Sequence, residues 1–503
     1  TFSSLRQFRF VRKLRRQRKT IQTSRAKFIT EQKLVKTPAE SHIYKMNKLK
    51  YLKGDKTIWA VIFLLAMASF LPVYSASTNL VHTVGTGTTF GILIKHFVHL
   101  SIGMFIVYFV HKLHFERFKK YSIFAIWIIV PALLFTLMQG KTIGGANASR
   151  WLTIPFINLS FQPSTLAFTV LMVYVARTLT KIKETEYNFQ DSVVQIWLPV
   201  GAVLIFILPS NFSTAALMFA MVCMLLYIGQ YPLKYLAIVL ASGIAVLALF
   251  FLLAKAFPDK KAFSRVNTWV SRIENFTTDK PDEDKYQIEN AKIAIAVGKI
   301  NGVGPGKSIQ KNFLPQSSSD FIFAIIIEEY GLIGGYLLVF FYMLLFFRFL
   351  IRANKTTNMF GKLLIIGLGF PIIIQALINM GVAVELLPVT GQPLPLISSG
   401  GTSVWMTCLS LGIILSVTKR EDEIAADLKD FQDREAALQR IIDREVSVMN
   451  EESTSESISD EEKKVNNMKY SIRESLKQEN ELDNQGDSLV NGQNPMNAVL
   501  NKK

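Results

Sequence analysis

The sequence predicts an all-α polytopic membrane protein with about ten transmembrane helices and a large structured extracytoplasmic loop between helices 7 and 8. Half of its 503 residues are apolar and the mean hydropathy is +0.28. A spanning helix needs roughly 20 mainly apolar residues, and runs of that kind recur along the chain. Basic residues are concentrated in alternate connections between the runs, as they are on the cytoplasmic side of membrane proteins.

The apolar runs account for most of the chain between the two polar ends. They cover residues 57–77, 90–112, 122–139, 163–180, 194–209, 214–230, 233–256, 321–349, 359–382 and 401–418. The first run is followed by further spans rather than by a soluble domain, so we interpret it as a retained helix and not as a signal peptide. Cys223 and Cys408 both fall within runs, and neither a disulfide nor a zinc site is indicated.

Charge divides the chain into three regions. Residues 1–56 hold seventeen Lys and Arg against three acidic residues, a net charge of +14, and form a basic cytoplasmic segment whose first 45 residues are a candidate extension. Such a segment favours anionic lipid head groups, at about 1 kcal/mol per basic residue, over nucleic acid. Residues 57–418 form the membrane domain, and residues 419–503 form a polar, largely disordered cytoplasmic tail with a possible helix over 421–448. Both termini are expected in the cytoplasm.

The longest connection, residues 257–320, is expected on the external side. Apolar residues from Ile288 to Ile300 recur at three- and four-residue spacing, which predicts a helix packed as a lid or amphipathic layer. The following turn, Gly302 to Ser308, has neither a preceding strand nor the spacing of an NTPase loop. Its irregular backbone can approach a substrate closely, and its amides could contact a phosphate.

Two carboxylate positions follow that turn. Asp320 stands at the mouth of a long apolar run, and two interpretations stay open: it caps the helix N-terminus, or it accepts a proton from a hydroxyl group. Glu328 and Glu329 lie deeper in the same run, where unpaired charges are expensive. We expect them to pair with a neighbouring helix.

The stretch 386–403 is apolar but broken by three prolines and three glycines, which predicts a re-entrant loop. Irregular backbone survives at membrane depth only beside protein or a watery cavity, so the loop is expected to line a cavity open to the external face. His96 and His99 stand three residues apart on one helical face. Without a third ligand we interpret them as packing or hydrogen-bonding residues, and no metal site is predicted.

Three ordered motifs carry a family resemblance. They are Gly302 to Gln310 with Leu314-Pro315, Asp320-Phe321 and Glu328-Glu329-Tyr330-Gly331; Pro388 to Ser403; and Ser149-Arg150-Trp151 with Gln162-Pro163-Ser164. Over residues 53–418 the chain resembles the SEDS family, which includes FtsW, RodA and SpoVE, and it is most similar to the division branch. Two polar positions of the family pattern differ here, at Thr165 and Asn211.

The resemblance implies a peptidoglycan glycan-strand polymerase, an inverting glycosyltransferase that uses lipid II, the undecaprenyl-diphosphate-linked disaccharide-pentapeptide. It implies action at the outer face of the cytoplasmic (inner) membrane, at the division septum, beside a class B penicillin-binding transpeptidase and other divisome proteins. Asp320 would be the catalytic base, with Mg²⁺ or Mn²⁺ as a candidate cofactor. The candidate substrate-binding residues are Lys95, Arg150, Trp151, Gln162, Ser164, Arg265, Lys307, Gln310, Pro395, Ser398, Gly400 and Gly401.

Two rival functions fit the same architecture. A lipid II flippase would also need many spans and a broken helix around a polar cavity. A non-catalytic divisome scaffold would follow if the changes at Thr165 and Asn211 had removed the chemistry. A carboxylate on the external side, Asp320, favours the polymerase over both.

Overall fold

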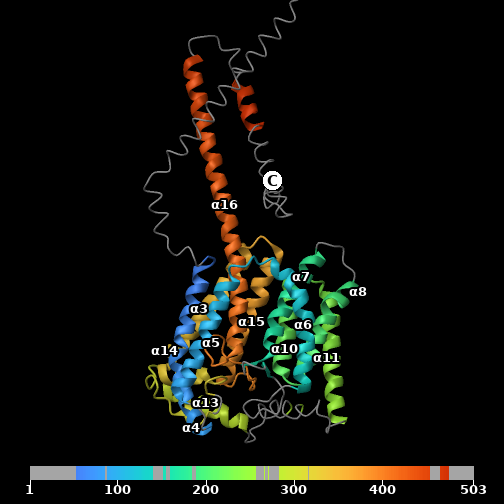
Figure 1. Cartoon of the computed structure of the whole chain (residues 1–503), viewed down its shortest axis with the longest axis vertical. Helices are drawn as coiled ribbons and strands as arrows, with labels where there is room; N and C mark the ends of the chain where they lie inside the picture. Colours follow the sequence, from blue (N-terminus) through green and yellow to red (C-terminus); the bar gives the residue numbers. More distant parts are fainter. Residues whose placement is uncertain are drawn as a thin grey trace, which may run out of the picture. The chain divides into compact units, whose positions relative to one another are not determined.

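The computed structural model describes residues 53–84, 88–139, 151–154, 159–183, 189–256, 266, 270, 283–314, 317–453 and 465–474 (Figure 1). The predicted extension and residues 257–282 of the predicted external loop, except 266 and 270, therefore lie outside the described residues. The chain divides into two units, residues 1–421 and residues 422–503. The first unit is a helical bundle.

The bundle is built from helices that follow the predicted spans. Its elements are α3 (Lys56–Ala68), α4 (Phe70–Val84), α5 (Thr89–Val110), α6 (Arg117–Gln139), β1 (Leu152–Ile154), β2 (Leu159–Phe161), α7 (Pro163–Lys183), α8 (Phe189–Ser192), the π-helix η2 (Val193–Trp197), α9 (Leu198–Ile207), α10 (Phe212–Ile228), α11 (Leu233–Ala256), α13 (Glu283–Gly298), the 3₁₀-helix η4 (Gln310–Asn312), α14 (Ile322–Lys355), α15 (Met359–Ala383) and α16 (Thr402–Ser453).

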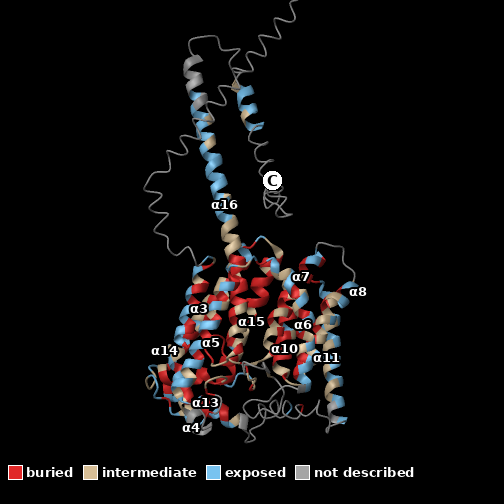
Figure 2. Ribbon diagram, in the orientation of Figure 1, coloured by how far each residue is buried: buried red, intermediate tan, exposed pale blue. Residues whose placement is uncertain are grey.

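Nine stretches of the described chain are helical, long and apolar enough to cross a membrane. The tenth predicted span is α10, which has 17 residues and lies at the short end of the spanning range. Most of the helices α7 and α15 is buried, whereas α11 is almost wholly exposed although strongly apolar (Figure 2). Exposed apolar helices around a buried centre are the pattern of a bundle whose solvent is lipid. The polytopic helical fold is confirmed.

Some local features were not predicted. The first span is broken at Ser69 between α3 and α4, where the Ser69 hydroxyl donates to the Ala66 carbonyl at 2.7 Å. Strands β1 and β2 form an antiparallel hairpin in which Thr153 pairs with Ser160.

The predicted tail helix exists as the last part of α16, and residues 465–474 form a further helix.

Helix α14 is interrupted at Gly331, whose φ of 69° and ψ of −173° are not helical. The segment 299–304, just after α13, bridges this break. The amides of residues 303 and 304 donate to the carbonyls of Glu328 and Glu329 at 2.9 and 3.0 Å, and the Leu332 amide donates to the Lys299 carbonyl at 2.9 Å. A side chain at position 331 would place its Cβ 2.0 Å from the Ile300 carbonyl oxygen, so only glycine fits this crossing.

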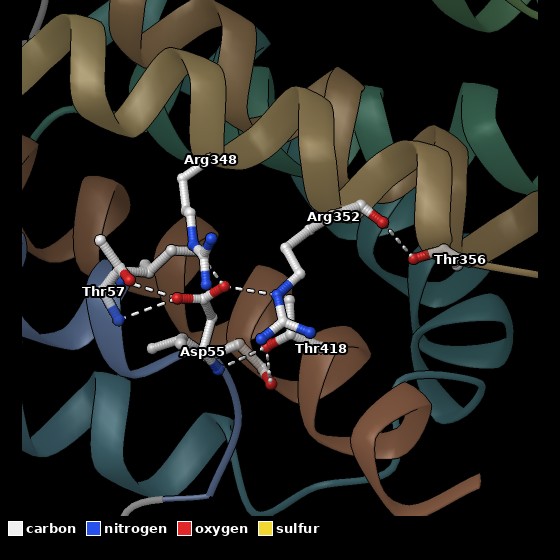
Figure 3. A network of polar contacts seen from close by, with 8 residues as sticks. Asp55, Thr57, Arg348, Arg352, Thr356 and Thr418 are labelled. Carbon is white, nitrogen blue, oxygen red and sulfur yellow. Dashed lines mark hydrogen bonds and ion pairs between the residues drawn. The ribbon is translucent and has the colours of Figure 1, made fainter. Parts of the chain in front are cut away.

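The two ends of the bundle differ in their chemistry, and we name them by what they hold. The Asp55 end, where α3 begins and α14 ends, contains a wholly buried carboxylate. Asp55 accepts from the guanidinium groups of Arg348, at 2.8 Å, and Arg352, and its own amide donates to the Thr418 hydroxyl at 3.1 Å (Figure 3). This cluster joins α3, α14 and α16.

Burial alone would raise the pKa of Asp55, but the hydrogen bonds from Arg352 and Arg348 outweigh it and lower the pKa below its ordinary value. The carboxylate therefore stays charged. The opposite end, which we call the α13 end, carries α13, the segment 299–320 and the stretch 384–401 between α15 and α16, and it lies at the bottom of Figure 1.

Candidate active site

Asp320 lies in the turn that precedes α14, with a partly exposed side chain. The N-cap position of α14 is Phe321, which makes no side-chain capping bond and is fully buried. Asp320 therefore stands one position before the N-cap residue of α14. The buried Phe321 anchors the turn on the bundle and leaves the preceding carboxylate at its rim.

The stretch 384–401 holds this turn in place. It has no helix or strand, as predicted for a re-entrant loop, and residues 394–398 are buried whereas residues 384–387 are exposed. The Ser399 amide donates to the Ser318 carbonyl at 2.9 Å, and the Ser398 hydroxyl donates to the Ser319 carbonyl at 2.6 Å. A Cβ at Gly391 would lie 3.5 Å from the Oδ2 atom of Asp320. The backbone at Gly391 is thus the part of the loop that approaches the carboxylate.

The loop is itself tied to the surrounding helices. Gln392 donates from Nε2 to the Thr214 hydroxyl of α10 at 2.9 Å, and Gln375 of α15 donates from Nε2 to the Pro393 carbonyl at 2.9 Å. The predicted residue Pro395 is buried, and its carbonyl accepts from the Tyr342 hydroxyl of α14. The loop is therefore a fixed wall beside Asp320.

Two further predicted residues, Gly400 and Gly401, form the turn into α16. The Gly400 amide donates to the Ser398 carbonyl at 2.8 Å. A Cβ at Gly401, where φ is +45°, would lie 3.5 Å from Nε2 of His99, and the His99 ring stacks on Trp405. Lys95 lies one turn before His99 on α5 with an exposed side chain. The predicted loop glycines and Lys95 thus belong to neighbouring parts of the α13 end.

The end of the glycine-rich turn and the residues that follow it are held by a carboxylate of α14, while residues 305–307 are exposed. The amides of Ile309 and Gln310 donate to Oε1 of Glu328 at 2.8 and 3.2 Å, and the Ser308 hydroxyl donates to the same carboxylate. Because the protein's own carboxylate takes these amides, they are not available to a phosphate. Glu328 was predicted to pair with a neighbouring helix. Its donors are instead residues 308–310, at the start of the 3₁₀-helix η4, and not a membrane-spanning helix.

Glu329 behaves as predicted, because it accepts from the Ser75 hydroxyl of the neighbouring helix α4. Lys311 donates from Nζ to the Ser75 hydroxyl at 3.1 Å and to the Gly306 carbonyl at 2.8 Å. Lys307 remains exposed on the turn, and Gln310 is partly buried. Of the turn's cations, Lys307 is the one that reaches solvent, whereas Lys311 also secures the turn.

The third predicted motif lies apart from the contacts just described. Trp151 precedes β1, and the Gln162 carbonyl accepts from the Thr165 hydroxyl at 2.8 Å in the first turn of α7. Ser164 lines a small pocket together with Leu133, Thr136, Leu137, Phe206, Ile207 and Ser210. Arg150 and Arg265 lie outside the described residues.

The two departures from the family pattern have structural roles. The Thr165 hydroxyl donates to the Gln162 carbonyl within the first turn of α7. Asn211 is the N-cap of α10 and accepts from the Thr214 amide at 3.3 Å. Thr214 in turn holds Gln392, so the changed position still supports the loop beside Asp320.

A family model described as "Cell cycle protein", that of FtsW, RodA and SpoVE, matches residues 55–423. The chain belongs to this family. Among curated relatives, a "Probable peptidoglycan glycosyltransferase FtsW" of Enterococcus hirae is 28% identical over 382 residues, 73% of this chain and 94% of that protein. One of the same name from Thioalkalivibrio sulfidiphilus is 32% identical over 296 residues, 58% of this chain and 71% of that protein.

Solved structures of the family share the fold. A chain of the structure titled "Structural coordination of polymerization and crosslinking by a peptidoglycan synthase complex" aligns with a TM-score of 0.56 at 21% identity, covering 73% of this chain and 98% of that one. The rod shape determining protein RodA of Thermus thermophilus aligns with a TM-score of 0.52 at 21% identity, over 73% and 97% of the two chains.

The described part of this family member contains no group of three His, Cys, Asp or Glu side chains arranged to hold a metal ion. His96 and His99 point to different partners: Nε2 of His96 lies 2.9 Å from the Ser69 hydroxyl, and His99 stacks on Trp405. The interpretation of both as packing or hydrogen-bonding residues is confirmed.

Sequence reasoning missed one residue that touches both parts of the site. Asn379 of α15 donates from Nδ2 to the carbonyls of Asp320 and Gln392, each at 2.8 Å. Its signal in the sequence was an amide inside a long apolar run, where polar side chains need a partner. Nothing in the run indicated which partner it has.

Proposed function

We propose that this chain is a peptidoglycan glycosyltransferase that polymerises lipid II into glycan strands during cell division. The observation that carries the proposal is the Asp320 turn held against the loop 384–401, in a chain that belongs to the FtsW, RodA and SpoVE family. A fixed carboxylate beside a fixed wall is what a proton-abstracting group needs, because rate depends on geometry as well as on basicity.

In the proposed reaction Asp320 takes the proton of the acceptor sugar's 4-hydroxyl as that oxygen attacks the anomeric carbon of the donor. The new glycosidic bond forms with inversion, and the bond to undecaprenyl diphosphate breaks with the electron pair leaving on the diphosphate. A positioned base contributes about 10²- to 10⁴-fold. The exposed Lys307 and Lys95, with Arg150 and Arg265, are the candidate cations for the leaving diphosphate, alone or with Mg²⁺ or Mn²⁺.

The distribution of basic residues supports an orientation in the membrane. Lys112, Arg117 and Arg352 belong to connections or helix ends at the Asp55 end. Lys419 of α16 lies beside them and donates from Nζ to the Lys112 carbonyl at 3.4 Å. By the rule that cytoplasmic connections are rich in Lys and Arg, we place the Asp55 end and both termini in the cytoplasm, and Asp320 at the outer face.

A partner completes the proposal. The solved complex that shares this fold is titled as one that coordinates polymerization and crosslinking. We propose that this chain works beside a class B penicillin-binding transpeptidase, with other divisome proteins, at the division septum.

The test uses the full-length protein purified with its candidate transpeptidase and supplied with labelled lipid II, with and without Mg²⁺ or Mn²⁺. Glycan polymer is compared for the parent, Asp320→Asn and Glu385→Gln. Glu385 is a matched control because it is a carboxylate at the same end whose ion pair is with Lys292 of α13. We expect polymer from the parent and from Glu385→Gln but none from Asp320→Asn.

Polymer from Asp320→Asn at the parent's rate would remove Asp320 from the base role, and loss in Glu385→Gln alone would move the role to Glu385. No polymer from the folded parent, beside an active reference polymerase, would contradict the glycosyltransferase proposal. Translocation of labelled lipid II in vesicles by that inactive parent would then identify a flippase. If no translocation occurred, the non-catalytic scaffold would be the remaining function.

A further inference from the structure

Asn379 is a polar side chain in the apolar interior of α15, and only 1% of it is exposed. Its amide nitrogen donates to two backbone carbonyls at 2.8 Å each, those of Asp320 and Gln392. The first carbonyl belongs to the turn that carries the proposed base. The second belongs to the loop that walls the site, one residue from Gly391.

The orientation of this amide follows from its neighbours. Both are carbonyl oxygens, which only accept hydrogen bonds, so the NH₂ group with its two hydrogens must face them. The other atom, Oδ1, is buried and has no hydrogen-bond partner among the described residues. A buried acceptor without a partner lowers stability. An apolar residue of the same size would avoid that loss, but it would leave the carbonyls of Asp320 and Gln392 without this donor. The amide is therefore explained by the two segments that it joins.

The two carbonyls are otherwise parts of separate structures. Asp320 precedes α14, and Gln392 is fixed to α10 through Thr214. One amide thus sets the distance between the Asp320 turn and the loop whose Gly391 backbone approaches the Asp320 carboxylate. Without it the turn would still be held by Ser398 and Ser399, but at residues 319 and 318 and not at Asp320 itself.

We propose that Asn379 is a positioning residue for Asp320, an inference that rests on the proposed role of Asp320 as the base. It does not touch the substrate. Its two hydrogen bonds fix the backbone of the base against the loop, so that the carboxylate meets the acceptor hydroxyl at reacting distance. A displacement of about 1 Å at such a group costs about 10²-fold in rate.

The test compares Asn379→Leu with Gln375→Leu in the full-length protein with its partner. Gln375 lies one turn earlier on α15 and binds the same loop at Pro393, but not the Asp320 turn. We expect Asn379→Leu to lower kcat for polymerisation about 10²-fold, with KM for lipid II nearly unchanged and with a loss of thermal stability comparable to that of Gln375→Leu, because the two lost hydrogen bonds are partly offset by removal of the unpaired Oδ1. Gln375→Leu should lower kcat much less than Asn379→Leu, because it loosens the loop at Pro393 while Asn379 still holds the Asp320 turn.

Full activity of Asn379→Leu would overturn the proposal, and so would a loss of activity accompanied by a fall in stability well beyond that of Gln375→Leu, since that would mark a purely structural residue. If Asn379→Leu does not fold, Asn379→Asp serves instead: it has the same shape, and its ionised form cannot donate. A kcat for Asn379→Asp within about threefold of the parent would overturn the proposal in the same way.

A second readout does not depend on activity. Hydrogen exchange of the Ser399 amide, which donates to the Ser318 carbonyl, reports on the contact between turn and loop. We expect faster exchange there in Asn379→Leu and unchanged exchange in Gln375→Leu. If the parent makes no polymer, the proposed function fails while exchange still decides whether Asn379 holds the two segments together. Unchanged exchange in Asn379→Leu overturns the positioning proposal.

Discussion

Helix α14 meets carboxylates at both of its ends but uses them in opposite ways. At the Asp55 end it contributes Arg348 and Arg352 to a buried carboxylate of another helix. At the α13 end it contributes its own carboxylate, Glu328, to amides of the 302–310 turn. An ion pair fixes two helices against each other and tolerates rotation, whereas amides bound to a carboxylate are directional and fix the shape of a loop.

The first prediction breaks the Asp55 end. Asp55→Ala removes the acceptor from two guanidinium groups and from the first turn of α3, and removing one partner of a buried pair typically costs about 3–5 kcal/mol. Because 31% of the Arg348 side chain and 17% of the Arg352 side chain are exposed, both can reach water. We therefore expect a loss of about 3 kcal/mol, measured by denaturant unfolding in detergent micelles.

The control is Asp430→Ala, which removes an ion pair to Arg434 on the exposed part of α16, where both side chains are more than half exposed. Exposed pairs contribute about 0.5 kcal/mol or less. Equal losses of unfolding free energy in the two variants would show that the buried cluster contributes no more stability than an exposed ion pair.

The second prediction breaks the bridge on which the α13 end depends. Gly331→Ala forces a positive φ on alanine and sets its Cβ against the Ile300 carbonyl, which costs about 1–3 kcal/mol in backbone strain alone. The control is Gly201→Ala in α9, where a Cβ meets nothing within 4 Å. That change is expected to stabilise the helix by up to about 1 kcal/mol. An alanine at position 331 without effect on unfolding would contradict the described crossing.

A third variant sharpens the comparison by removing charge and keeping shape. Glu328→Gln retains one acceptor oxygen for the amides of residues 309 and 310 but loses the carboxylate that strengthens those bonds. We expect a loss of about 1–2 kcal/mol and a lower rate of glycan polymerisation, because the turn that carries Lys307 loosens. The exposed Glu289 of α13 provides the control, and Glu289→Gln should change stability by less than about 0.5 kcal/mol.

The smallest effect is a pH dependence confined to the Asp55 end. The folded-state pKa of Asp55 is lowered, so its stabilising contribution is fully present above the ordinary Asp pKa of about 3.9 and is lost as the pH falls through the lowered folded value. The difference in unfolding free energy between the parent and Asp55→Asn should be constant near neutral pH and shrink below about pH 4. A difference that grows on acidification would contradict the sign of this pKa shift.

The sequence predicted the spans well, because the transfer of an apolar run into lipid depends on composition and length. It also predicted the helix at Ile288 to Ile300 and the irregular loop at 386–403, since both depend on local pattern. The break at Gly331 was not predicted, although the glycine was part of a recognised motif. Its conformation is imposed by the backbone of the segment 299–304, which lies outside the short sequence window that periodicity uses.

The candidate site was predicted in part. Asp320, Ser398 and the loop glycines meet at the α13 end, because the motif itself places them there. The partners of Glu328 were not predicted, since two of its three donors are backbone amides, which every residue has and which no side-chain pattern marks. Asn379 was missed for the same reason: both of its acceptors are main-chain carbonyls.

The crossing at Gly331 has a mechanical consequence. Helix α14 lacks part of its own hydrogen-bond ladder at Gly331, and the segment 299–304 supplies hydrogen bonds on both sides of this kink. If the segment 299–304 detached, the short part of α14 next to Asp320 would be free to move relative to the long part that contains Arg352. The stiffness of α14 at Gly331 therefore depends on the contact with the segment 299–304 and is lost when that contact breaks.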